Sequence, residues 1–168
     1  MLERVRLQVM HKAYIALGSN LNMPQQQLQE AIKSLQNMAT TEVVAISPFY
    51  QSIPLGPQDQ PDYINAVACI NTKLKPLELL QQLQNIEQQQ GRQRLRHWGE
   101  RTLDLDILLY DNLEMQTEKL TIPHYDMHNR EFVIVPLADI APELILPNGI
   151  KINELVKTFL PHQMQKIL

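Results

Sequence analysis

Apolar and acidic residues alternate between residues 103 and 109, and this pattern constrains the fold more than any other part of the sequence. The apolar positions have the period of two that is typical of a strand with one buried face: Leu103, Leu105, Ile107 and Leu109. Asp104 and Asp106 then share the opposite face, with Cα atoms roughly 6.5 Å apart at about 3.3 Å rise per residue. Two carboxylates this close repel each other unless a cation lies between them. Mg²⁺ is commonly held by one or two carboxylates together with substrate phosphates.

Arginine is concentrated immediately before this strand. The chain has seven arginines, and four of them lie within ten residues: Arg92, Arg94, Arg96 and Arg101. Guanidinium groups bind phosphate through paired hydrogen bonds, so their position beside Asp104 and Asp106 predicts a nucleotide-phosphate site. A solvated face on an edge strand is the alternative interpretation of an isolated Asp-x-Asp pair, and the adjacent arginines favour the phosphate site.

Composition narrows the class of protein. A chain of 168 residues with 44% hydrophobic and 20% charged residues is expected to form one globular domain, 1–168, with a flexible N-terminal extension at 1–11. A net charge of −3 argues against a general nucleic-acid or membrane-surface partner. Cys69 is the single cysteine, which excludes an internal disulfide and fits a cytoplasmic location. We expect small-molecule substrates and a monomer.

The order of the elements predicts the fold class. Apolar patterns indicate strands at 13–17, 42–49 and 63–72 and at the aspartate segment, and helices that begin at Pro24 and Pro76. The first strand is expected to end in a turn at 18–20, and the second helix to stop at Gly91. The resulting β-α-β-β-α-β order is that of a ferredoxin-like α+β core, with an antiparallel sheet and helices on one of its faces. C-terminal additions include expected helices at 132–139 and 152–159.

Four separated segments together resemble the motifs of the 6-hydroxymethyl-7,8-dihydropterin pyrophosphokinase family. They lie at 13–21, at 54–66, at 97–108 and around Pro123-His124-Tyr125 with Arg130 and Phe132. The resemblance extends from about residue 12 to residue 149. It implies an enzyme of folate biosynthesis that transfers the β,γ-pyrophosphoryl group of ATP to the hydroxymethyl oxygen of the pterin and releases AMP.

The resemblance also implies roles for individual residues. Asp104 and Asp106 would hold two Mg²⁺ ions, and Arg92 and Arg101 would grip the phosphates as catalytic groups. The implied pterin contacts are Ser52, Leu55, Tyr63, Asn65, Trp98 and Phe132, with Tyr63 and Phe132 as the two aromatic plates around the ring. The implied ATP contacts are Glu87, Arg92, Arg94, Trp98, Arg101, Ile107, Lys119, Thr121, His124, Tyr125 and Arg130.

Three other functions fit parts of the sequence. A ferredoxin-like RNA-binding module would need aromatic and basic side chains over the sheet, and aromatic content is only 5%. An Asp-x-Asp nucleotide-sugar transferase usually has a longer, two-part architecture. A protein that binds these ligands without turnover would carry the same motifs, and release of AMP from ATP would distinguish it.

Overall fold

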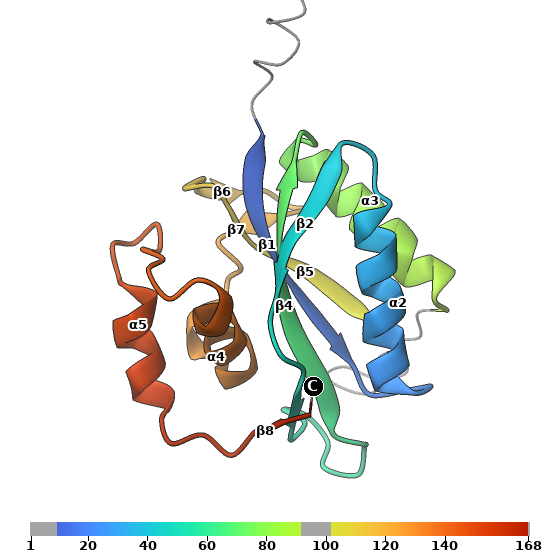
Figure 1. Ribbon diagram of the computed structural model, residues 1–168, viewed down its shortest axis with the longest axis vertical. Helices are drawn as coiled ribbons and strands as arrows, with labels where there is room; N and C mark the ends of the chain where they lie inside the picture. The colour runs from blue at the N-terminus through green and yellow to red at the C-terminus, as the bar shows by residue number, and fades with distance from the viewer. Residues whose placement is uncertain (1–9, 92–101, 168) are drawn as a thin grey trace, which may run out of the picture.

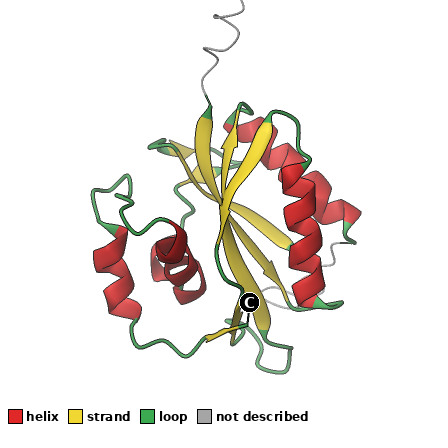
Figure 2. Ribbon diagram, in the orientation of Figure 1, coloured by secondary structure: helices red, strands yellow, loops and turns green. Residues whose placement is uncertain are grey.

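The structure, a computed structural model, describes residues 10–91 and 102–167, and an antiparallel sheet forms its centre (Figure 1 and Figure 2). The long strands are β1 (His11–Ser19), β2 (Thr41–Ile46), β4 (Tyr63–Thr72) and β5 (Asp104–Tyr110). β1 lies between β5 and β4, and β2 and the short β3 (Tyr50–Ser52) share the other side of β4. Helix α2 (Pro24–Gln36) joins β1 to β2, and α3 (Pro76–Gln89) joins β4 to β5. This order and pairing confirm the predicted ferredoxin-like α+β fold.

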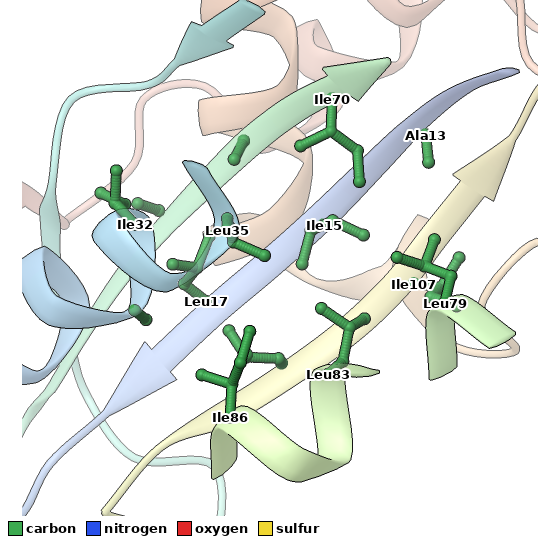
Figure 3. Close-up of a cluster of buried hydrophobic side chains, with 14 of the residues drawn as sticks. Ala13, Ile15, Leu17, Ile32, Leu35, Ile70, Leu79, Leu83, Ile86 and Ile107 are labelled. Carbon is green, nitrogen blue, oxygen red and sulfur yellow. The ribbon is translucent and has the colours of Figure 1, made fainter. Parts of the chain in front are cut away.

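Helices α2 and α3 cover one face of the sheet (Figure 1). Each begins with a proline in its first turn, where the missing N–H costs no hydrogen bond. In α3 the carboxylate of Glu78 also accepts a hydrogen bond from the backbone N–H of Lys75, at 2.8 Å. The apolar stripe of α2 packs against β1, and that of α3 packs against β5. Figure 3 shows side chains of both helices, among them Leu35 of α2 and Leu83 of α3, in one buried cluster with the sheet. These contacts bury the main core of the protein.

A second helical layer covers the opposite face of the sheet (Figure 1). It consists of α4 (Glu131–Ile140), α5 (Ile152–Leu155) and the 3₁₀ turns η1 (Met127–Asn129) and η2 (Val156–Phe159). Val133 and Leu137 of α4 pack against Val67 of β4 and Leu108 of β5. The core helices α2 and α3 lie on one face, as predicted. The C-terminal helices, whose position was not predicted, cover the other face, because the sheet carries apolar side chains on both faces.

Four predicted boundaries need correction. β1 continues to Ser19, because Gly18 pairs with strands on both sides where a turn was expected. The strand expected at 42–49 ends at Ile46, and β3 is a separate strand. His11 belongs to β1, where it pairs with Thr72 and its ring stacks on Tyr110, so it is not part of an extension. The helix expected at 152–159 is α5 followed by η2.

Short strands complete the described chain. β6 (Met115–Gln116) and β7 (Thr121–Ile122) form a small hairpin, and β8 (Gln165–Lys166) pairs with β3 at the end of the sheet. Tyr50 of β3 donates a hydrogen bond to Asp139 of α4, which ties this end of the sheet to the second helical layer. Over residues 10–91 and 102–167, every helix is too short or too polar to cross a lipid bilayer.

Replacement of Leu83 by alanine should destabilise the protein by about 2–5 kcal/mol, because this side chain is fully buried between α3 and the sheet. Leu77→Ala, in the same helix but 46% exposed, is the matched control and should change stability by only about 0.5 kcal/mol. Urea denaturation followed by circular dichroism measures both. Equal losses for the two variants would contradict the packing described for α3.

Candidate active site

A cavity of about 430 Å³ opens between the sheet and the beginning of α4. Residues predicted from sequence for different ligands lie together on its wall. They are Ser52, Leu55, Tyr63, Asn65, Asp104, Asp106, His124, Tyr125, Arg130 and Phe132. Segments as far apart in the chain as β3 and α4 therefore contribute to a single concave site.

Strand pairing sets the floor of this cavity. Gly18 of β1 lies opposite Asn65 of β4 on one side and opposite Asp104 of β5 on the other. One step along the same face of β1, Ala16 lies opposite Asp106. The two carboxylates thus border one side of β1, and the predicted pterin-binding amide borders the other side.

The side chain of Asn65 has a fixed orientation. Ser52 donates a hydrogen bond from its Oγ to Oδ1 of Asn65 at 2.6 Å, and both residues are buried. Since Oδ1 accepts this bond, the amide nitrogen of Asn65 is directed to the other side, toward Gly18. The amide can therefore donate in a defined direction at the floor of the cavity.

A buried amide pair holds the loop that follows β3. Asn20 donates from Nδ2 to Oε1 of Gln60 and to the carbonyl oxygen of Pro61, each at 2.9 Å. Asn20 and Gln60 are both almost fully buried. The same loop carries Ile53 and Leu55 on the cavity wall, and these apolar side chains are 60% and 57% exposed. A fixed loop that exposes apolar side chains at a cavity is suited to an apolar ligand surface.

On the other side of the cavity, His124 is held as a neutral ring. Its Nδ1 accepts a hydrogen bond from the backbone N–H of Asp126 at 3.2 Å, so Nε2 carries the proton. Burial, and then the positive charge of Arg130, lower the pKa of His124 to about 4. The backbone N–H of His124 donates to the carbonyl oxygen of Leu108, which fixes this segment to β5. His124 is therefore an uncharged hydrogen-bond donor.

Arg130 lies among aromatic rings. Its guanidinium is 5.9 Å from the ring centre of Tyr125 and 5.7 Å from that of Phe132, and its Nε donates to Asp126 at 3.1 Å. Cation–π contacts at this distance are attractive. Tyr125 is also stacked on His124 and is 72% exposed. This side of the cavity combines a positive charge with open aromatic surface, which suits a base or ring that carries phosphate.

Asp104 and Asp106 have the donor chemistry for a hard divalent cation. Both are partly buried on the cavity wall, on alternate positions of β5. In the part of the chain that the structure describes, no cluster of three or more His, Cys, Asp or Glu side chains is placed to hold a metal. A two-carboxylate set is characteristic of Mg²⁺ sites that substrate phosphates complete. Asp104 and Asp106 therefore have the ligand chemistry expected for the predicted Mg²⁺.

Glu87 has a contact that the sequence did not reveal. Its carboxylate is buried at the end of α3 and accepts a hydrogen bond from the backbone N–H of Leu105 at 2.7 Å. Leu105 is the residue between Asp104 and Asp106. Glu87 therefore fixes the backbone from which both carboxylates project, and its side chain does not reach the cavity wall.

The remaining predicted residues divide into two groups. Ile107 has its side chain in the main core, Thr121 lies on β7, and Lys119 is exposed beside the small hairpin. None of these three side chains lines the cavity. The second group lies outside the described residues: Arg92, Arg94, Trp98 and Arg101. Their roles stay predictions.

Sequence reasoning missed several residues of the cavity wall. They are Ala16, Leu17, Gly18, Ile53, Leu108 and Val133. A signal was present in β1, where the side chains on one face decrease in size along the strand, from Tyr14 to Ala16 to Gly18. Such a gradient is expected where a sheet leaves space for a ligand, because each smaller side chain fills less of the volume above it.

A ferredoxin-like domain whose cavity joins paired carboxylates to a fixed amide and aromatic rings has the features of a small-molecule phosphotransferase. The comparison with known families identifies the particular one. Residues 14–142 match the HPPK family, described as 7,8-dihydro-6-hydroxymethylpterin-pyrophosphokinase. The chain belongs to this family and is a diphosphotransferase. The resemblance inferred from its motifs is thereby confirmed.

Similar proteins support the assignment over nearly the whole length. The chain is 65% identical to the 2-amino-4-hydroxy-6-hydroxymethyldihydropteridine pyrophosphokinase of Haemophilus influenzae, over 92% of this chain and 97% of that protein. It is 49% identical to the Pseudomonas aeruginosa enzyme of the same name, over 88% and 91%. A crystal structure of Plasmodium falciparum HPPK-DHPS has the same fold, with a TM-score of 0.71 at 14% identity. It is matched over 90% of this chain, which spans only 43% of that longer chain.

Glu87→Ala should weaken metal binding indirectly, because it removes the hydrogen bond that holds the backbone of β5. Loss of the Glu87 carboxylate leaves the buried N–H of Leu105 without its acceptor, at a cost of about 1–3 kcal/mol in stability. It also loosens the backbone of β5 between Asp104 and Asp106. Glu87→Gln keeps an acceptor oxygen and should show a smaller effect. Urea denaturation and the Mg²⁺ concentration that gives half-maximal AMP release measure the two consequences. Alanine and glutamine variants that both behave like the unmodified protein would rule out this supporting role.

The ring of His124 should remain uncharged at neutral pH in the free protein, because burial and Arg130 disfavour its protonated form. A pH titration of the histidine ring protons by NMR should give a midpoint near 4, and His124→Gln identifies the signal. Addition of an ATP analogue should raise the midpoint, since phosphate charge favours the imidazolium. A midpoint near the ordinary histidine value of about 6.5 in the free protein would contradict the described environment.

Proposed function

We propose that this cavity binds ATP and 6-hydroxymethyl-7,8-dihydropterin side by side and transfers pyrophosphate between them, which gives the pterin diphosphate and AMP in folate biosynthesis. The observation that carries the proposal is the shared floor of the site. Gly18 has the amide of Asn65 on one side and the carboxylate of Asp104 on the other. A substrate held by Asn65 therefore lies next to the carboxylates that would receive the phosphates.

The pterin would occupy the side of the cavity formed by β3, β4 and α4. Asn65 donates from its fixed amide to the edge of the ring, and Tyr63 and Phe132 lie on the wall where they could stack on its faces. Leu55 and Ile53 offer apolar surface from the anchored loop. Binding in this way directs the hydroxymethyl arm away from Asn65 and toward β5.

ATP would occupy the side formed by β5 and the segment around His124. The neutral ring donates from Nε2 without adding charge, and Arg130 supplies a positive charge held by Asp126. Backbone groups of Ile107 face the same outer edge of β5 as the N–H of Leu105, since residues two apart in a strand point to the same side. They could contact the nucleotide although the Ile107 side chain is in the core. The resemblance alone supports the other residues of the proposed ATP site. They are Glu87, Arg92, Arg94, Trp98, Arg101, Lys119 and Thr121.

Asp104 and Asp106 would hold two Mg²⁺ ions. The bound ions would neutralise phosphate charge and align the attacking and transferring oxygens. The protein contributes position: the two side chains project from one face of β5, whose backbone Glu87 fixes. Phosphoryl transfer requires positioning and charge compensation more than covalent participation of the protein. We also propose that the enzyme acts as a cytoplasmic monomer.

Asp104→Asn and Asp106→Asn should each reduce AMP release by about 100-fold or more, because each removes a charge that compensates the metal and phosphates. The assay supplies Mg²⁺, ATP and the hydroxymethyl dihydropterin, and calorimetry measures Mg²⁺-dependent binding of an ATP analogue. Each variant should retain the circular dichroism spectrum of the unmodified protein.

Glu42→Gln is the control for this experiment. It removes one carboxylate from the exposed surface of β2 and should leave AMP release unchanged. Folded aspartate variants with near-normal Mg²⁺-dependent turnover would overturn the proposed role of β5. Pterin and nucleotide binding by the unmodified protein without AMP release would show that it is a binding protein.

A further inference from the structure

Gly18 occupies the middle of the cavity floor for a reason that the backbone does not explain. The glycines with positive φ in the described chain are Gly91 and Gly149, so Gly18 has a backbone conformation that other residues can adopt. It pairs regularly with strands on both sides, without a turn. Glycine within a strand lowers stability. The reason for a glycine at this position is therefore the absence of a side chain.

A side chain at this position would meet the pterin-binding groups. A Cβ atom built on Gly18 would lie 3.0 Å from Nδ2 of Asn65 and 3.9 Å from Cδ1 of Tyr63. The first contact is shorter than an ordinary van der Waals contact, and the side chain of Asn65 cannot easily move away. Its Oδ1 is bound by Ser52 at 2.6 Å, and the residue is only 6% exposed. An added methyl group would therefore displace the amide from its bound orientation or occupy the space above β1.

The position of Gly18 also fixes the distance that a bound substrate must span between Asn65 and Asp104. Asn65 and Asp104 lie directly opposite it on the two neighbouring strands. At about 4.8 Å per strand, their Cα atoms are roughly 10 Å apart. A ligand that contacts Asn65 with one edge and presents its reactive oxygen at the carboxylates must cross the backbone of β1 at Gly18. A bicyclic ring with a one-carbon arm suits this span better than a single ring.

We propose that Gly18 is a specificity-determining residue: its bare backbone lets a flat bicyclic substrate lie across β1 between Asn65 and the β5 carboxylates. The inference rests on the proposed function, because it assumes that the substrate held by Asn65 is the pterin. It adds that the main chain of β1 sets the depth of the pterin site. Gly18 acts by leaving room for the ring and for the amide of Asn65.

Gly18→Ala tests the inference by comparing the affinities for the two substrates. Calorimetry should show at least a tenfold increase in the Kd for the hydroxymethyl dihydropterin, and less than a twofold change in the Kd for an ATP analogue with Mg²⁺. Val44→Ile adds one carbon to the exposed strand β2, far from the cavity wall, and should change neither constant. Unchanged pterin affinity in Gly18→Ala, or an equal loss for both ligands, would overturn the inference.

A second measurement uses the unmodified protein and so does not depend on the folding of the variant. NMR should detect a nuclear Overhauser effect between the pterin and the Hα protons of Gly18, besides effects to the ring of Tyr63. Effects to Tyr63 without one to Gly18 would show that the ring does not cross β1. AMP release by the unmodified protein separately tests the proposed function. Normal turnover together with an unaffected Gly18→Ala variant would reject only the role of Gly18.

Discussion

The backbone pairing of β1 with β4 and β5 is the interaction on which the rest of the site depends. β1 is paired along most of its length on both sides, and both faces of the sheet are buried, one under α2 and α3 and the other under α4. A shift of one residue would turn buried side chains to the wrong face. The register is therefore fixed by the cores, and it places Asn65 and Asp104 opposite the same glycine. Residues from strands far apart in sequence thus acquire a defined separation before any ligand binds.

Buried polar contacts then fix the parts of the site that the sheet does not hold by itself. The pairs are Ser52 with Asn65, Asn20 with Gln60, and Glu87 with the backbone of Leu105. A hydrogen bond of this kind adds only about 0.5–1.5 kcal/mol net, whereas a buried group that loses its partner costs about 1–3 kcal/mol. The asymmetry makes each contact hard to break in isolation. The amide of Asn65, the loop after β3 and the strand that carries Asp104 and Asp106 are therefore preorganised, which reduces the ordering cost of ligand binding.

The sequence predicted those features that depend on local periodicity or on a motif. The alternation around Asp104 and the apolar stripes of α2 and α3 identified the core elements, because a buried face leaves a period in the sequence. The covering of the second face by α4 was missed, since it depends on packing between distant segments such as Val133 and Val67. In the site, the cavity residues named from the motifs do lie together. The role of Gly18 was missed because its surroundings come from strand register, and glycine by itself suggested a turn.

The charges of the described cavity have a consequence for nucleotide binding. Asp104 and Asp106 are the carboxylates on its wall, His124 is held neutral, and the charge of Arg130 is partly balanced by Asp126. A triphosphate that approaches this wall alone would meet like charge beside β5, which opposes binding. The balance must come from a divalent cation that arrives with ATP or from the arginines in the sequence between residues 92 and 101. The side proposed for the pterin, by contrast, is lined by the uncharged groups of Ser52, Tyr63 and Asn65. Pterin affinity should therefore depend on shape and hydrogen bonding, and nucleotide affinity on cations and ionic strength.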